Sequence, residues 1–189
     1  MERKRLVVGI SGASGAVYGI RLLEVLAQRA EIETHLVITR TARLVIAQEA
    51  DCTAAQVEAL ADHVYAPEDL TAAIASGSFV TSGMLVAPCS IKMLSAIANS
   101  YAADLTSRAA DVTLKEGRPL VLVVRETPLH LGHLRLMARA AEIGAVIFPP
   151  VPAFYGRPQT VAEVVDGTVG RALARLGLDN DLYTKWKKQ

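Results

Sequence analysis

Gly9-Ile10-Ser11-Gly12-Ala13-Ser14-Gly15 is the stretch that decides the fold of this chain. The apolar residues that lead into it, Leu6 to Ile10, are typical of a buried strand. The apolar residues after it recur at helical spacing, namely Val17, Ile20, Leu23, Leu26 and Ala30. A strand, a glycine-rich turn and a helix in this order present backbone N–H groups and the positive end of a helix dipole to an anion. The stretch therefore predicts a phosphate or nucleotide site at the first loop.

The composition agrees with an α/β fold. The chain has 189 residues, of which 51% are hydrophobic and only 5% aromatic, a balance expected of a parallel sheet buried on both faces by helices. This length predicts one domain spanning residues 1–189. Lys and Arg total 20 against 19 for Asp and Glu, so no overall field favours nucleic acid or a membrane surface as a partner.

Predicted strands and helices alternate along the rest of the chain. The further strands are expected at 33–38, 83–87, 120–124 and 145–148, and the helices at 41–61, 91–98, 104–115, 130–142 and 161–176. Pro88 is expected to end the strand at 83–87, and Gly117 to cap the helix before it. Residues 66–82 indicate an irregular loop and no more. The alternation predicts a three-layer, doubly wound parallel sheet of the Rossmann-like or flavodoxin-like class.

Polar residues follow each predicted strand. They are Ser11 to Ser14, Thr39 with Arg40, Cys89 to Lys92, Arg125 to Thr127, and Tyr155 with Arg157. Ligands of open α/β sheets bind outside the carboxyl ends of the strands, so these residues are expected to share one rim. Hydroxyls, cations and the carboxylate of Glu126 are suited to a phosphorylated ligand and to proton transfer.

Thr39-Arg40 narrows the choice of nucleotide. A dinucleotide site for NAD usually has Asp or Glu at the end of the second strand, where it binds the ribose hydroxyls. Thr39-Arg40 disfavours NAD. NADP is not excluded, because Arg40 could bind its 2′-phosphate. A mononucleotide such as FMN fits at least as well.

Six runs resemble the UbiX-type flavin prenyltransferases, in order and over nearly the whole chain. They are Gly9-Ile10-Ser11-Gly12-Ala13-Ser14-Gly15-Ala16, Pro88-Cys89-Ser90-Ile91-Lys92, Arg108-Ala109-Ala110-Asp111-Val112, Leu114-Lys115-Glu116-Gly117-Arg118-Pro119-Leu120, Arg125-Glu126-Thr127-Pro128 and Pro152-Ala153-Phe154-Tyr155. The later runs are much more specific than the glycine loop.

The resemblance implies an enzyme that transfers a dimethylallyl group from dimethylallyl monophosphate to reduced FMN. Bonds form at flavin N5 and C6, and the product, prenylated FMN, serves UbiD-type decarboxylases, including the one in ubiquinone synthesis. The family resembles flavodoxin-related proteins that assemble as dodecamers and need no metal ion. A monophosphate leaving group carries less charge than a diphosphate, so a fixed cage of cations and a phenol can stabilise it without Mg²⁺.

The resemblance also implies roles for individual residues. The FMN-binding positions are Gly12, Ala13, Ser14, Thr39, Ser90, Ile91, Lys92, Met93 and Arg125. The positions that hold the dimethylallyl phosphate are Arg108, Lys115, Tyr155 and Arg171. Ser14 and Glu126 are the catalytic candidates, and Glu49 and Trp186 match positions near the active site. Thr39 and Arg40 stand where many relatives have Ser and Lys.

Simpler roles compete with several of these assignments. Arg108, Lys115 and Arg171 also fit as solvated helix charges, and Ile91 and Met93 as packing residues. Glu126 could form a structural ion pair with Arg125. Trp186 could be a packing anchor or a subunit contact.

Two other functions remain to be weighed. One is an FMN-dependent cysteine decarboxylase, but the catalytic His and the Asn-rich substrate clamp of those enzymes are not evident here. The other is a non-catalytic FMN carrier.

The positions of the His and Cys residues bear on metal binding and on the cellular compartment. His130 and His133 share a helix face, but no third ligand accompanies them, so no metal site is expected. Cys52 and Cys89 form no CxxC pair and fit a reducing compartment. The first apolar run is too short for a signal peptide, so a cytoplasmic location is expected.

Overall fold

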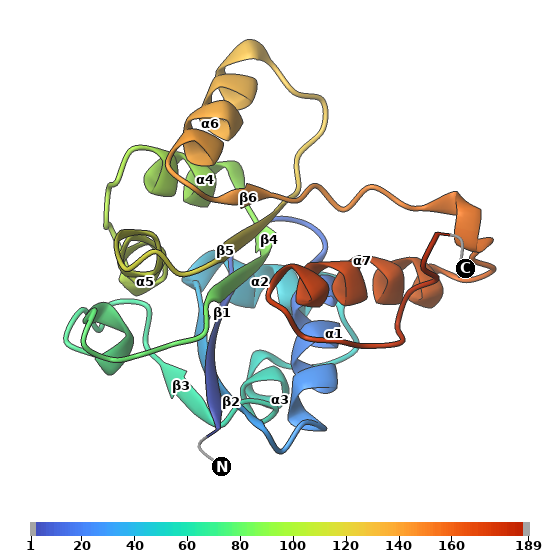
Figure 1. The fold of residues 1–189 in the computed structure, drawn as a ribbon, viewed down its shortest axis with the longest axis horizontal. Helices are drawn as coiled ribbons and strands as arrows, with labels where there is room; N and C mark the ends of the chain where they lie inside the picture. The colour runs from blue at the N-terminus through green and yellow to red at the C-terminus, as the bar shows by residue number, and fades with distance from the viewer. Residues whose placement is uncertain (1–2, 187–189) are drawn as a thin grey trace.

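The computed structural model describes residues 3–186, which fold around one parallel sheet of six strands. The strands are β1 (Lys4–Ile10), β2 (Ile32–Ile38), β3 (His63–Tyr65), β4 (Met84–Cys89), β5 (Leu120–Val124) and β6 (Val146–Ile147). Their order is β3-β2-β1-β4-β5-β6, which is the order of the doubly wound Rossmann sheet (Figure 1). The prediction of a doubly wound parallel sheet is confirmed.

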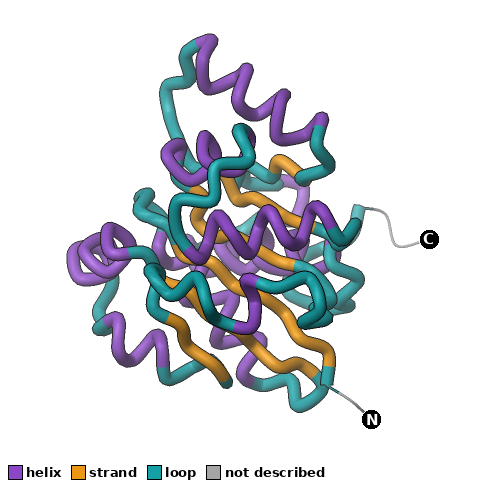
Figure 2. The backbone as a smooth tube through the Cα atoms, turned by 90° about the vertical axis from the view of Figure 1, so that its left-hand side faces the viewer, coloured by secondary structure: helices purple, strands orange, loops and turns teal. Residues whose placement is uncertain are grey.

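Helices cover both faces of this sheet. They are α1 (Ala16–Ala27), α2 (Arg40–Glu49), α3 (Ala54–Glu58), α4 (Ile91–Ala98), α5 (Leu105–Lys115), α6 (Leu131–Glu142) and α7 (Val161–Arg175), with short 3-10 turns η1 (Ala73–Ala75) and η2 (Phe154–Gly156). Figure 2 shows the twisted strands between the surrounding helices. None of the helices within residues 3–186 combines the length and the apolar character needed to cross a bilayer.

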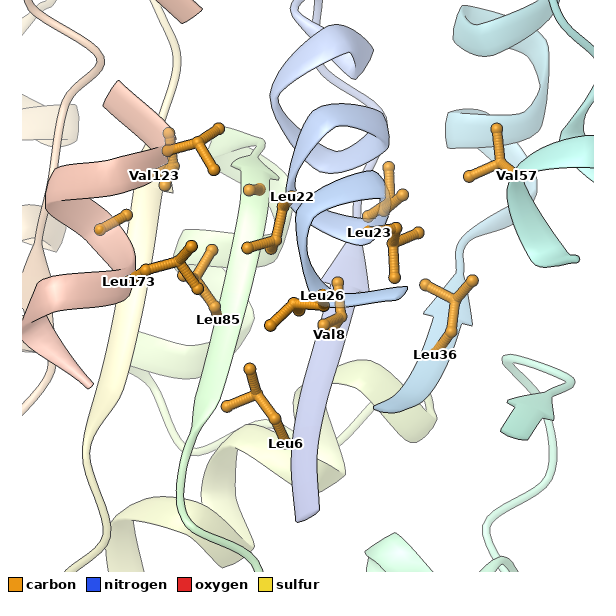
Figure 3. Close-up of a cluster of buried hydrophobic side chains, with 14 of the residues drawn as sticks. Leu6, Val8, Leu22, Leu23, Leu26, Leu36, Val57, Leu85, Val123 and Leu173 are labelled. Carbon is orange, nitrogen blue, oxygen red and sulfur yellow. The ribbon is translucent and has the colours of Figure 1, made fainter. Parts of the chain in front are cut away.

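The alternation of side chains along the strands produces two cores. Val8 of β1 and Leu85 of β4 face α1 and α7, where Leu22, Leu26 and Leu173 pack against them (Figure 3). The neighbouring strand residues face the other way, and the core on that side is completed by α4, α5 and α6. We call these the α1/α7 face and the α4/α5 face.

Several predicted elements differ from the observed ones. The helix expected at 41–61 is two helices, because Thr53 and Gln56 form a capping box that starts α3. The edge strand β3 was missed, since three residues are too few to show a strand period.

The prediction that Pro88 ends the third strand is wrong, because β4 continues to Cys89. The pairing of β4 with β5 shifts between Val86 and Cys89. Proline has no N–H to donate to a regular ladder, so it is tolerated where the ladder is interrupted in this way. Gly117 has φ +65° after α5, as a glycine cap requires.

Small residues of α1 allow it to lie close to the sheet. A Cβ atom at Gly19 would lie 2.3 Å from the carbonyl oxygen of Ala87 and 2.9 Å from the side chain of Ile10. Val17, expected in the apolar stripe of this helix, is instead 46% exposed. Gly19 is therefore the residue that sets the separation between α1 and β4.

Gly19→Ala is expected to lower the free energy of unfolding by about 1–2 kcal/mol, because backbone atoms must move to admit the methyl group. Gly167→Ala in α7 is the matched control. Nothing lies within 4 Å of the added Cβ atom there, so helix propensity should raise stability by about 0.5–1 kcal/mol. Urea denaturation of both variants measures the difference, and equal effects would contradict the packing argument.

Candidate functional site

The candidate site lies where the strand order reverses, between the carboxyl ends of β1 and β4. The Ser11 hydroxyl donates to the carbonyl of Pro88 at 2.9 Å and accepts from the backbone N–H of Ser90 at 2.8 Å. The N–H of Thr39 donates to the carbonyl of Ile10 at 3.0 Å, and that of Arg125 to the carbonyl of Cys89 at 3.1 Å. The ends of β1, β2, β4 and β5 are thus joined into one rim, as predicted, whereas Tyr155 and Arg157, which were also expected there, line a separate cavity.

Three helices begin at this rim. Thr39 caps α2 through the N–H of Ala42, and Ser90 caps α4 through the N–H of Met93. Gly15 begins α1 at φ +97° and has no side chain to cap it. The helix dipoles of α1, α2 and α4 therefore favour an anion beside the rim.

Glu49, at the end of α2, supplies the missing cap of α1. Its Oε2 accepts from the N–H of Gly15 at 2.7 Å and of Ala16 at 3.4 Å. Partial burial opposes ionisation, but the Ser14 hydroxyl, these two N–H groups and the Arg125 charge outweigh it, so the pKa of Glu49 lies below its ordinary value. The hydroxyl of the catalytic candidate Ser14 is thus bonded to Glu49. No local spacing signals this pair, which lies 35 positions apart in the chain (49 − 14).

Glu49→Gln is expected to lower the free energy of unfolding by about 0.5 kcal/mol at pH 7, because the variant loses the negative charge at the start of α1. A lowered pKa in the folded state gives stability that is present above the ordinary value of 4.5 and is lost as pH falls through the folded value. The two proteins should therefore converge in strong acid. Thermal unfolding at pH 7 and in strong acid measures this. A difference in stability between the two proteins that stays the same at both would contradict it.

The rim also carries cations without a hydrogen-bonding partner. Arg125 is half-buried and Lys92 exposed, and within residues 3–186 neither side chain makes a hydrogen bond or an ion pair. The Arg125 charge nevertheless contributes to the lowered pKa of Glu49. Burial raises the pKa of the Tyr18 phenol, and the Arg125 charge opposes this rise. Two cations are therefore available to an anion at the rim.

Glu126 is exposed beside Arg125, and its Oε1 accepts from the N–H of Thr127 at 2.9 Å. No ion pair between Glu126 and Arg125 occurs in the described part of the chain, so the structural ion pair that competed with a catalytic role is not formed. The second carboxylate oxygen of Glu126 faces no described donor.

The side chains of Ile91 and Met93 pack in the core, while their backbone lies in the first turn of α4 at the rim and stays a predicted FMN contact. Met93 is 5% exposed in the core of the α4/α5 face, and its N–H is already bonded to Ser90. Ile91 packs against the same core. Both side chains have the packing role that competed with flavin binding.

A cavity of about 740 Å³ lies beyond the carboxyl end of β6, between the segment after β6, helix α7 and residues 181–184. Tyr155 and Arg171 line it, together with Phe148, which follows β6. Trp186 packs edge-on against Tyr155, with ring centroids 5.2 Å apart. The structure therefore brings Tyr155 and Arg171 to one cavity and places Trp186 beside it.

The other two predicted phosphate ligands lie across the sheet. Helix α5 packs on the α4/α5 face, whereas α7 packs on the α1/α7 face. The guanidinium of Arg108 bonds to the carbonyl of Ala75 at 3.1 Å and to Asp111 at 2.8 Å, and Lys115 pairs with Glu116. One chain by itself thus does not assemble the predicted cage of Arg108, Lys115, Tyr155 and Arg171.

Comparisons with known proteins show the family of this chain. A model of the family described as "Flavoprotein" matches residues 1–173. Flavin prenyltransferase UbiX of Escherichia coli K12 is 59% identical over 186 residues, which cover 97% of this chain and 98% of the relative. The chain belongs to the UbiX-type flavin prenyltransferases. Its resemblance to them in sequence is confirmed.

Solved structures of UbiX-type proteins share the whole fold. AnUbiX (PadA1), in complex with FMN and dimethylallyl pyrophosphate, has a TM-score of 0.96 at 47% identity, with 100% of both chains covered. A dodecameric FMN-dependent UbiX-like decarboxylase from E. coli O157:H7 has a TM-score of 0.95 at 46% identity, covering 97% of this chain and 99% of that one. The fold is thus shared with UbiX-type proteins, one of which was solved in complex with FMN.

Proposed function

We propose that this chain transfers a dimethylallyl group from dimethylallyl monophosphate to reduced FMN and makes prenylated FMN. The observation that carries the proposal is the rim at the switch point. Three helices begin at the rim, where nucleotides bind in this fold, and Arg125 and Lys92 follow β5 and β4 there. Membership of the UbiX-type family supplies the reaction.

The residues of the rim fit a flavin mononucleotide. The glycine loop packs closely on the start of α2, since a Cβ atom at Gly12 would lie 2.5 Å from the side chain of Thr41. Gly12, Ala13, Ser14, Thr39, Ser90, Lys92 and Arg125 would hold the flavin and its phosphate. When bound in its reduced form, FMN supplies the nucleophilic N5 and C6 atoms.

Tyr155 and Arg171 bind the phosphate of the prenyl donor in the cavity between α7 and the segment after β6. As the bond between the dimethylallyl carbon and the phosphate oxygen breaks, negative charge grows on the departing phosphate. The guanidinium of Arg171 and the phenol of Tyr155 stabilise this charge in place of a metal ion. The solved complex of AnUbiX contains dimethylallyl pyrophosphate in place of the monophosphate. The contacts of Tyr155 and Arg171 with the phosphate would therefore decide which of these two donors this chain uses.

Glu126 takes the proton that leaves C6 when the new ring closes, while the alkene of the dimethylallyl group gains a proton, so ring closure leaves the total number of protons unchanged. Its free carboxylate oxygen and its exposure at the rim suit a general base. Ser14, bonded to Glu49, is the hydroxyl that orients the flavin beside it. Their roles as catalytic residues rest on the proposed function.

The proposal includes a homo-oligomer. The sheet of one chain separates Arg108 and Lys115 from Tyr155 and Arg171, so a cage of all four requires α5 of a second copy. The UbiX-like decarboxylase with a TM-score of 0.95 is dodecameric. A dodecamer of this chain is therefore the proposed assembly, and its mass in solution tests it.

The product would be delivered to a UbiD-type decarboxylase, including the one in ubiquinone synthesis.

The proposed location is the cytoplasm. Cys52 and Cys89 are free thiols, and burial raises the pKa of the Cys89 thiol, so it stays protonated and structural.

Mass spectrometry of the flavin tests the function. The oligomer is incubated without oxygen with reduced FMN and dimethylallyl monophosphate, and the extracted flavin should gain one C₅H₈ unit while inorganic phosphate is released. A flavin of unchanged mass would leave an FMN carrier. Carbon dioxide release from a peptide with a C-terminal cysteine would instead indicate a cysteine decarboxylase.

A further inference from the structure

A second cluster of chemically active side chains lies at the other end of the strands, on the edge formed by β2 and β3. In the parallel register, His35 of β2 pairs with His63 of β3, and Arg5 of β1 pairs with Glu33 of β2. Paired residues, and residues two apart on one strand, share a face of the sheet. Glu33, His35 and His63 therefore project together from the α4/α5 face.

The three side chains lie at the spacing of metal ligands. The Oε1 atom of Glu33 is 3.0 Å from Nε2 of His35 and 3.3 Å from Nε2 of His63. All three ligand atoms lie within 4.8 Å of one another. Ligands held about 2.0–2.1 Å from a tetrahedral zinc ion are separated by similar distances.

His35 is fixed in the orientation of a ligand. It is 2% exposed, and its Nδ1 is 2.9 Å from the hydroxyl of Tyr65. A ligating histidine commonly donates its second ring N–H to an oxygen in this way, which turns the lone pair of the other nitrogen to the metal. The edge of Phe79 closes the apolar side, with ring centroids 5.1 Å apart.

His63 provides the adjustable and open side of the cluster. Its ring stacks on that of His35 at 4.7 Å, and its side chain is 51% exposed on the edge strand. Because His63 is exposed, solvent reaches this side of the cluster and can supply a fourth ligand. Two imidazoles and a carboxylate with one open position suit Zn²⁺ better than Mg²⁺ or Ca²⁺, which prefer oxygen ligands.

We propose that Glu33, His35 and His63 form a zinc site with a water molecule as the fourth ligand. Arg5 is the competing cation, because its Nε lies 3.5 Å from the same Glu33 oxygen, while its guanidinium covers the ring of Phe79 at 4.8 Å. Glu33 has a second oxygen, so it serves the ion and Arg5 together. The bound ion ties β3, whose ladder has three residue pairs, to β2. This site is separate from the flavin rim and is not part of prenyl transfer.

Zinc titration of the full-length protein tests the site. After treatment with a chelator, calorimetry with zinc chloride should give one ion per chain, and saturating zinc should raise the melting temperature. His63→Ala and Glu33→Gln should each weaken zinc binding at least tenfold, since each removes or weakens a ligand.

His130→Asn is the matched control, because it removes another exposed histidine and retains a side chain that can cap α6. It should bind zinc like the native chain. Native protein that binds no zinc, or a loss of binding as large in His130→Asn as in His63→Ala, would overturn the proposal. Metal content and melting temperature are read without prenyl transfer, so the result is independent of the proposed function.

Discussion

Glu126→Gln is expected to slow formation of prenylated FMN by roughly 100-fold or more while FMN binding stays within about twofold. The glutamine keeps an oxygen that accepts from the N–H of Thr127, so the loop after β5 should keep its conformation. It removes the base that takes the proton from C6. Single-turnover reactions, followed by the mass of the flavin, measure the rate, and flavin fluorescence measures binding.

Glu142→Gln is the control for this experiment. Glu142 is an exposed carboxylate at the end of α6, away from the rim, and its replacement should leave the rate unchanged. A Glu126→Gln protein that loses FMN or unfolds would show that Glu126 is structural. A rate equal to that of the native chain would remove it from the mechanism.

Arg171→Ala is expected to weaken binding of dimethylallyl monophosphate by roughly 10- to 100-fold, because a charge-assisted hydrogen bond to phosphate is lost. FMN binding should change much less, since Arg171 lines the cavity and not the rim. Calorimetry with each ligand separates the two affinities. Equal losses for both would argue against a separate phosphate cage.

Arg175→Ala provides a control on the same helix. Arg175 is exposed one turn after Arg171 and does not line the cavity, so general loss of positive charge from α7 is the same in both variants. Only Arg171→Ala should reduce donor affinity. Equal effects would assign the binding to the overall field of the helix.

Most of the strands and helices, and the first turn of the site, could be predicted from local sequence. Apolar runs with glycine and proline boundaries predicted most of the strands and helices, and Ser11 to Gly15 predicted the first turn of the site. The polar residues after β1, β2, β4 and β5 were correctly expected at one rim, because parallel strands bring their carboxyl ends to the same edge, whereas Tyr155 and Arg157 line a separate cavity. The specific runs from Pro88 onward are sufficient by themselves to indicate the family.

Only the tertiary structure decided which of these residues meet. It bonded Ser14 to Glu49, placed Met93 in the core, and set Arg108 and Arg171 on opposite sides of the sheet. It also paired His35 with His63 on a strand too short to recognise. Sequence periodicity reports which face of its own element a residue occupies, whereas contacts between elements depend on strand order and register, which are long-range and cooperative. The local chemistry was therefore readable from the chain, and the partners of each group were not.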